Sequence, residues 1–269
     1  MDTNLIFDLG LHKGEDSEFY LKKGFRVVGV EASEELCRIS RVALKKYIDN
    51  GQMRIVNCAV GDKDGDTISF YKNTSISVWG TVDINWAKRN EMFGAQSIRE
   101  QVRTVRLDTL IRKFGMPYYM KIDIEGTDLL AIRQLTGLHE RPKYLSIESE
   151  KISWQKLLDE CSVLKTLGYT NFKIINQKYI QQQKCPEISL EGQFVHHVFK
   201  EGSSGLFGGE LPGKWMTLEE CIKTYRRLFR MYRLFGDYGY FNNKFCKSIL
   251  HKMRIGYPDV GWYDTHATF

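Results

Sequence analysis

Apolar runs and amphipathic segments alternate through the first 200 residues. Apolar runs typical of β-strands occupy 4–9, 26–31, 54–60, 118–124, 144–148, 172–175 and 194–199, and helical periodicity occupies 14–23, 33–47, 127–136 and 154–167. Alternation of this kind is what a parallel sheet with helices on both faces requires. The pattern predicts a doubly wound, mostly parallel seven-stranded α/β sheet. Shorter strands are expected at 67–71 and 102–107, and a helical piece near 84–92.

The pattern changes after residue 200. Residues 202–209 are rich in glycine and serine and predict a flexible loop. Thr217 and Glu220 then have the spacing of a capping box, which predicts a helix start, and apolar residues recur at helical spacing from Leu218 to Phe235. We therefore expect two parts: a main domain at 1–200 and a C-terminal helical extension at 201–269.

A glycine loop follows the first strand. Asp8, Gly10 and Gly14 lie between that strand and a helix, and Glu31 ends the second strand. A carboxylate about 20 residues after the first glycine suits a ribose. Gly10 is expected to let the backbone approach a ligand, and Gly14 to let the helix pack on the strand. The spacing lacks a tight pyrophosphate turn, which favours S-adenosylmethionine over NAD or FAD. His12 lies inside this loop and is an even choice between ligand contact and a structural role.

Acidic residues lie at the ends of the predicted strands. Lys121, Asp123 and Glu125 project to one side of their strand by alternation, and Glu148 ends the next strand along the chain. The ligand edge of an open parallel sheet is the carboxyl end of its strands. These four residues are the catalytic candidates, although Glu148 could instead pair with Lys121 or Lys143. Asp108 is expected to be a helix N-cap.

The sequence resembles the FkbM-type methyltransferases. The resemblance rests on Asp8-x-Gly10, on Leu107-Asp108-Thr109-Leu110 and on Lys121-Ile122-Asp123-Ile124-Glu125-Gly126, and it covers roughly residues 4–200. Trp262-Tyr263-Asp264-x-His266 and the Gly-Ser-Ser-Gly loop are similar to pieces found in one branch of that family. The resemblance implies a class I, S-adenosylmethionine-dependent enzyme, typically an O-methyltransferase of sugars or polyketide-type products.

The resemblance also implies roles for single residues. Asp8, Gly10 and Gly14 would hold the methionyl end of the cofactor, Glu31 its ribose, and Asp62 would lie near its adenine. A hydroxyl acceptor needs a base or a metal to take its proton. We prefer Asp123, Glu125 or Glu148 as the base over a shared Mg²⁺, because no further oxygen-ligand motif is present. Lys121 would orient these acids or an acceptor oxygen.

Charge distribution adds a second interpretation. The chain carries a net charge of +6, and residues 214–269 hold 10 Lys/Arg against 5 Asp/Glu. A basic extension suits an acidic partner such as nucleic acid, or is only a solvated helix face. An RNA methyltransferase and a nucleoside-binding protein without catalysis are therefore alternatives to a small-molecule or glycan enzyme.

Targeting signals are not evident in the sequence. No apolar stretch approaches the ~20 residues of a membrane span, and no signal-peptide pattern opens the chain. The six cysteines are scattered without a Cys-x-x-Cys motif, which predicts reduced thiols and a cytoplasmic protein.

Overall fold

A computed structural model gives the architecture of the chain. It describes residues 1–73, 80–84, 87–88, 96–124, 126–150, 152–200, 202–236, 239–243, 246, 248, 252 and 260–269.

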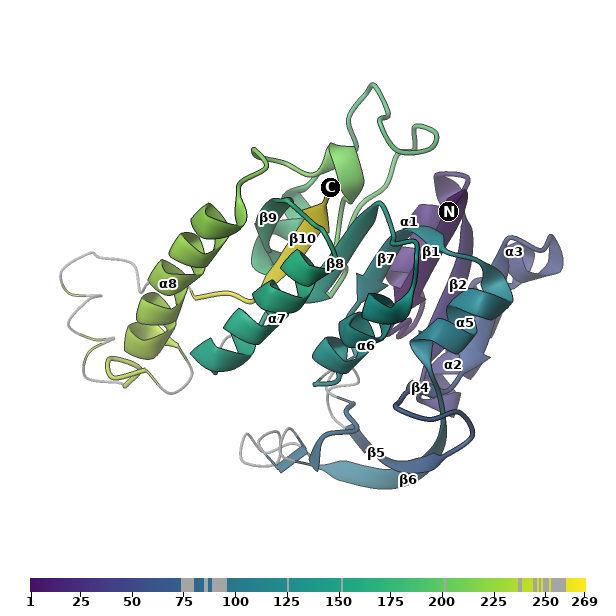
Figure 1. Cartoon of the computed structure of the whole chain (residues 1–269), viewed down its shortest axis with the longest axis horizontal. Helices are drawn as coiled ribbons and strands as arrows, with labels where there is room; N and C mark the ends of the chain where they lie inside the picture. The colour runs from purple at the N-terminus through teal and green to yellow at the C-terminus, as the bar shows by residue number, and fades with distance from the viewer. Residues whose placement is uncertain are drawn as a thin grey trace.

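The centre of the molecule is a seven-stranded sheet (Figure 1). Its order is β3-β2-β1-β7-β8-β10-β9, and every strand is parallel to its neighbours except β10, which is antiparallel to both. The strands are β1 Asp2–Leu9, β2 Arg26–Glu31, β3 Met53–Asn57, β7 Pro117–Ile122, β8 Tyr144–Glu148, β9 Asn171–Asn176 and β10 Tyr263–Thr268. The predicted doubly wound, mostly parallel sheet is therefore confirmed.

A second, three-stranded sheet lies beyond one end of the first (Figure 1). It has the order β4-β6-β5 and consists of β4 Ala59–Val60, β5 Thr67–Asn73 and β6 Ser97–Val105. The strand predicted at 54–60 is thus divided, because β3 pairs with β2 while β4 pairs with β6.

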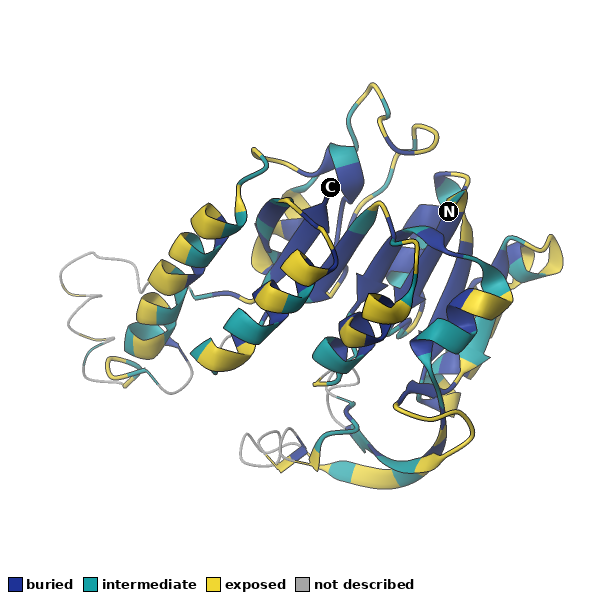
Figure 2. Ribbon diagram, in the orientation of Figure 1, coloured by how far each residue is buried: buried dark blue, intermediate teal, exposed yellow. Residues whose placement is uncertain are grey.

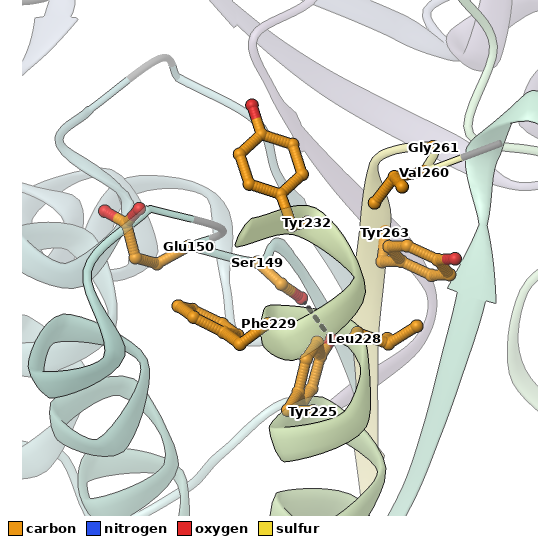
Figure 3. A pocket seen from close by; sticks show the side chains of 9 residues that line it. All are labelled: Ser149, Glu150, Tyr225, Leu228, Phe229, Tyr232, Val260, Gly261 and Tyr263. Carbon is orange, nitrogen blue, oxygen red and sulfur yellow. Dashed lines mark hydrogen bonds between the residues drawn. The ribbon is translucent and has the colours of Figure 1, made fainter. Parts of the chain in front are cut away.

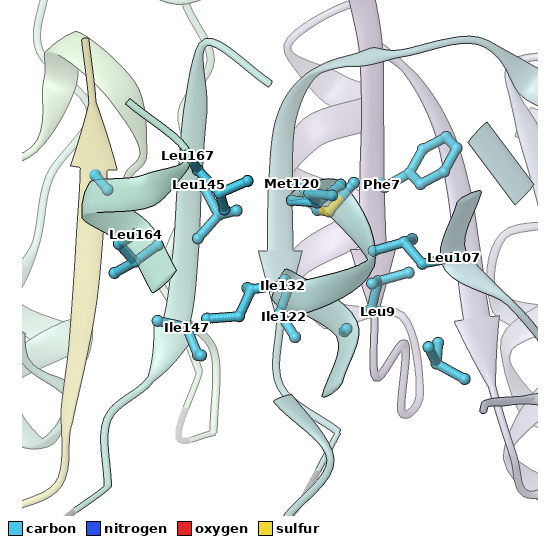
Figure 4. Close-up of a cluster of buried hydrophobic side chains, with 14 of the residues drawn as sticks. Phe7, Leu9, Leu107, Met120, Ile122, Ile132, Leu145, Ile147, Leu164 and Leu167 are labelled. Atoms are coloured by element: carbon cyan, nitrogen blue, oxygen red, sulfur yellow. The ribbon is translucent and has the colours of Figure 1, made fainter. Parts of the chain in front are cut away.

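Helices cover both faces of the central sheet. They are α1 Glu15–Lys22, α2 Glu34–Ala43, α3 Lys45–Asp49, α5 Leu107–Phe114, α6 Asp128–Gln134, α7 Trp154–Thr166 and α8 Leu218–Phe235. Helices α5 to α8 pack on one face, where an aliphatic core is centred on Met120, Ile122, Leu145 and Ile147 (Figure 4). Helices α1 and α3 pack on the other face.

Capping explains several helix boundaries. The Ser33 side chain accepts a hydrogen bond from the Leu36 N–H at the start of α2, as predicted. Thr217 and Glu220 form the predicted capping box of α8. Asp108 is not an N-cap: α5 begins at Leu107, and Asp108 in its first turn pairs with Arg106 and Arg112.

The glycine-rich segment is buried (Figure 2). Ser203 to Gly208 are all buried, and the Phe207 ring stacks on Tyr119 of β7 with the ring centroids 4.7 Å apart. Farther along, a buried ion pair between Lys23 and Glu210 joins this segment to the end of α1. The prediction of a flexible loop is therefore wrong, because the segment supplies part of the core on the α1 face.

The last strand of the sheet is not the predicted one. Residues 194–199 form no strand, and His197 and Phe199 pack their rings against Phe19 instead. The seventh strand is β10, which lies between β8 and β9. The division at residue 200 remains a prediction about folding units, but the sheet contains residues from both sides of it.

Two further sequence predictions concern the whole molecule. None of the helices within the described ranges has the length and apolar character needed to cross a membrane. The six cysteines are free thiols, four of them buried. The predicted helical piece at 84–92 lies largely outside the described residues.

Candidate active site

Charged side chains gather on the α1 face at the carboxyl ends of the parallel strands. Strand register places Asp8 of β1 opposite Lys121 of β7, and Glu148 of β8 opposite Asp264 of β10. Side chains two residues apart on a strand share a face, so Asp123 extends the side of Lys121. The sheet thus brings these five residues from four chain segments to one edge.

Lys121 is the centre of this group. Its Nζ lies 3.5 Å from Asp8 Oδ1, 3.5 Å from Asp16 Oδ2 and 3.2 Å from Asp123 Oδ2. Burial alone would lower the pKa of Lys121, but the three carboxylates hold it well above its usual value. Burial outweighs the attraction of Lys121 at Asp16 and raises the pKa of that carboxyl to about 6. One cation therefore serves three carboxyls.

The glycine loop is held by backbone contacts. The N–H groups of Gly10 and Leu11 both donate to the Val30 carbonyl at 3.0 Å. Gly10 has φ +90°, and a Cβ there would lie 1.8 Å from the Asp123 carbonyl oxygen. The structure thus gives a steric reason for glycine at position 10, the close approach to the residue after β7, and the predicted approach to a ligand stays a prediction.

Gly14 also differs from the expected packing. It is the N-cap of α1 with φ +87°, and a Cβ there would lie 2.7 Å from the Leu44 side chain at the end of α2. Its small size therefore allows packing against a neighbouring helix end, whereas packing on the strand was expected. Its predicted role in holding the cofactor stays a prediction.

Glu31 is buried and fixed by backbone donors. One carboxylate oxygen accepts the His12 N–H at 2.9 Å, and the other accepts the Ser33 N–H at 2.8 Å. Burial raises the pKa of Glu31 despite these hydrogen bonds. Each oxygen keeps a second lone pair for a ribose hydroxyl. His12 itself has φ +51°, and its Nδ1 lies 3.3 Å from Glu15.

The remaining predicted residues are placed less centrally. Asp62 is exposed in the turn after β4, where its carbonyl oxygen accepts a hydrogen bond from Arg106. Glu148 is half-buried at the end of β8. Glu125 lies outside the described residues. On either side of it, the N–H groups of Ile124 and Gly126 donate to the Asp128 carboxylate.

Asp16 and Asp264 belong to this group, although the sequence did not single them out as site residues. Asp16 lies on α1, where its carboxylate reaches Lys121 and also accepts the Ser204 N–H at 2.8 Å. Asp264 is 7% exposed. The alternation in Tyr263-Asp264-Thr265-His266 is a signal for a strand, but the segment is so polar that the sequence did not indicate a buried one.

A pocket lies on the opposite face, beside the ends of β8 and β10 (Figure 3). Its lining includes Tyr225, Phe229 and Tyr232 of α8, and Tyr263. At its base, the hydroxyls of Ser149, Tyr225 and Thr265 hydrogen-bond to one another. This ring of hydroxyls fastens α8 to the sheet.

Metal ligation was the alternative role of the acidic residues. Across the described ranges, no group of three His, Cys, Asp or Glu side chains is arranged to hold a metal ion. The Mg²⁺ alternative, which included Glu125, stays a prediction.

The fold and this edge define a doubly wound α/β protein with a nucleoside-type glycine loop and an acidic rim. The family model for the methyltransferase FkbM domain matches residues 8–174, and the chain belongs to this family. It is therefore an S-adenosylmethionine-dependent methyltransferase. A comparison with curated proteins found no match.

Solved structures show similarity at low identity. A precorrin-6y C5,15-methyltransferase from Geobacter metallireducens is 10% identical, with a TM-score of 0.37 over 65% of this chain and 68% of that one. A SAM-dependent methyltransferase from Archaeoglobus fulgidus is 10% identical, with a TM-score of 0.38 over 100% of this chain and 87% of that one.

Proposed function

We propose that the protein transfers a methyl group to a hydroxyl of a small molecule, and that the acceptor is a sugar or glycan. The observation that carries the proposal is the acidic rim, whose carboxylates Asp123 and Glu148 lie at the ends of the neighbouring strands β7 and β8, beside the buried Asp264 of β10. Carboxylates accept hydrogen bonds from hydroxyls, and a sugar offers several hydroxyls to such a rim.

The two substrates would occupy neighbouring parts of one edge. Asp8, Gly10 and Gly14 would hold the methionyl part of S-adenosylmethionine, Glu31 its ribose and Asp62 its adenine. The bound sulfonium supplies an activated methyl group. Adjacent strands are about 4.8 Å apart, so the ends of β7 and β8 lie within roughly 10 Å of β1. An acceptor on the rim would therefore adjoin the methionyl end.

The rim residues would activate the acceptor. A hydroxyl is a poor nucleophile until a base takes its proton, and Asp123 or Glu148 would be that base. Lys121 lies 3.2 Å from Asp123 and would orient it. Holding the hydroxyl in line with the methyl group would contribute much of the rate.

The rim also bears on the choice between a sugar and RNA. Clustered carboxylates repel phosphates, and this favours an uncharged hydroxyl acceptor. An RNA acceptor is the second candidate because α8 exposes Lys223, Arg226, Arg227, Arg230 and Arg233. Phosphate contacts by such a helix would make binding strongly salt-dependent.

The test is methyl transfer from labelled S-adenosylmethionine to a panel of sugar nucleotides, oligosaccharides and RNA. We expect an O-methylated sugar, identified by mass spectrometry and NMR. Glu148→Gln and Asp123→Asn are expected to lower kcat, the base variant by ~10²–10⁴-fold. S-adenosylhomocysteine binding, measured by calorimetry, should persist in both. Labelled RNA with no labelled sugar would contradict the proposal, as would unchanged kcat in both variants.

A further inference from the structure

Strand β10 carries one acid between β8 and β9. Asp264 lies opposite Glu148 of β8 on one side and opposite Ile175 of β9 on the other. Directly opposed residues of antiparallel strands have Cβ atoms about 4.5–5.5 Å apart. The carboxyls of Asp264 and Glu148 therefore lie side by side at the acceptor end of the rim.

The Asp264 carboxyl has no counter-charge of its own. It is buried, and the charges that act on it are those of the acids Asp123, Glu148 and Asp16, with Lys121 as the only cation among them. Lys121, the cation nearest this group, is already paired with Asp8, Asp16 and Asp123. A buried carboxyl without a cation keeps its proton, because ionisation in a low-dielectric site is costly.

The groups around Asp264 act mostly in the same direction. They are Glu148 on β8, Lys121 on β7 and Asp123 directly after that strand, Asp16 on α1, and His266 next along the same face of β10. Burial first, and then the charges of Asp123 and Glu148, raise the pKa of Asp264 well above its usual value, against the attraction of Lys121. Glu148 is only half-buried, so a negative charge costs less there than on the buried Asp264.

We propose that Asp264 and Glu148 form a carboxyl pair that shares one proton, with Glu148 as the base and Asp264 as its protonated positioning residue. The pair rests on the proposed O-methyl transfer. The acceptor oxygen forms the new O–CH₃ bond, the carbon–sulfur bond of the donor breaks with its electrons going to sulfur, and the hydroxyl proton passes to the Glu148 carboxylate. The Asp264 O–H would donate to the Glu148 carboxylate and orient it toward the acceptor oxygen.

The first test compares Asp264→Asn with Asp264→Leu. Asparagine mimics the protonated acid, so we expect the kcat of Asp264→Asn at neutral pH to stay within ~3-fold of wild type. Leucine cannot donate the hydrogen bond, so we expect the kcat of Asp264→Leu to fall by ~10–100-fold. The alkaline fall of kcat that comes from Asp264 ionisation should disappear in Asp264→Asn. S-adenosylhomocysteine affinity should be unchanged in both.

His266→Gln is the matched control. His266 is also buried on the same face of β10, two residues farther from the rim. A purely structural role for this strand would lower the yield of folded enzyme in all three variants and leave the shape of the pH profile unchanged. A normal alkaline limb in Asp264→Asn, or a loss of activity as large as that of Glu148→Gln, would overturn the proposal.

A second measurement needs no acceptor. The pKa of Asp264 is raised in the folded state, so its contribution to stability is full below about pH 4 and is lost as the pH rises. Asp264→Asn should therefore gain stability relative to wild type with increasing pH. Burial lowers the pKa of His266 to about 3, so His266→Gln should gain relative stability as the pH falls below about 6.5.

The two measurements separate the two proposals. Identical pH dependence of unfolding in wild type and Asp264→Asn would overturn the carboxyl pair. The expected difference in unfolding, without methylation of any hydroxyl acceptor, would support the protonated Asp264 and overturn the O-methyl transfer.

Discussion

The two halves of the ligand edge are built in different ways. On the proposed cofactor side, the loop after β1 and Glu31 at the end of β2 are fixed by backbone hydrogen bonds within about 25 residues of chain. On the proposed acceptor side, Asp123, Glu148 and Asp264 come from three distant segments and lie near the Lys121 cation.

This difference separates geometry from charge. Backbone donors fix Glu31 whatever the charges around it, whereas the acceptor side depends on how protons and one lysine are distributed among several acids. The cofactor side is therefore sensitive to steric changes, and the acceptor side to changes of charge and pH.

Removing the central cation should have the largest effect. Lys121→Met leaves Asp8 and Asp16 buried without their counter-charge, which is expected to cost about 3–5 kcal/mol of stability in denaturant unfolding near neutral pH. The loss should shrink as the pH falls and the acids become protonated. Lys45→Met, which removes an exposed pair with Asp49, is the control and should cost less than about 1 kcal/mol. Equal losses of stability in Lys121→Met and Lys45→Met would contradict the view that the acceptor side depends on its central charge.

A steric change should affect the cofactor side. Gly10→Ala combines a left-handed backbone with a Cβ placed 1.8 Å from the Asp123 carbonyl oxygen, and we expect a loss of about 3 kcal/mol and of S-adenosylhomocysteine binding.

Gly51→Ala separates the cost of a left-handed backbone from the cost of a steric clash. Gly51 has φ +83°, and a Cβ there would meet nothing within 4 Å among the described atoms. Only the backbone cost of about 1–2 kcal/mol is expected, with cofactor binding intact. If calorimetry shows both variants binding S-adenosylhomocysteine equally well, contact with β7 does not shape the cofactor side.

The smallest effect is expected on the exposed face of α8. Arg227→Glu with Arg230→Glu should change stability by less than about 0.5 kcal/mol and leave sugar methylation intact, because both side chains are exposed. Filter binding of RNA at two salt concentrations checks the alternative. If RNA forms a salt-sensitive complex with the wild type and the double variant abolishes it, RNA bound at α8 is the acceptor, and the sugar on the rim is not.

The strand, glycine loop, helix and second strand of the proposed cofactor side were readable from sequence because their signals are local. The apolar strands β1 and β2, the glycines between them and the acid at residue 31 lie within one stretch of chain. The residues Lys121 and Asp123 were also placed correctly at a strand end, because alternation fixes their common face. The reason for Gly10 was not readable, since its neighbour Asp123 is more than 100 residues away.

The acceptor side was only half readable. Strand β10 contains Asp264, Thr265, His266 and Thr268, which read as a polar segment, yet all four are buried between β8 and β9. Residues 194–199 have the alternation of a strand, but they form none, and the rings of His197 and Phe199 pack against Phe19 instead. Both errors arise because tertiary neighbours, and not local periodicity, decide which segment pairs.

The position of β10 also has a consequence for synthesis of the chain. Strand β9 leaves the ribosome roughly 90 residues before β10, the strand that joins it to β8, a delay of about 5–20 s at usual rates. During that interval, two strand edges face an open slot and can pair with another nascent chain. Crowded expression should therefore favour misassembly at this slot, and slower initiation or a holding chaperone should relieve it.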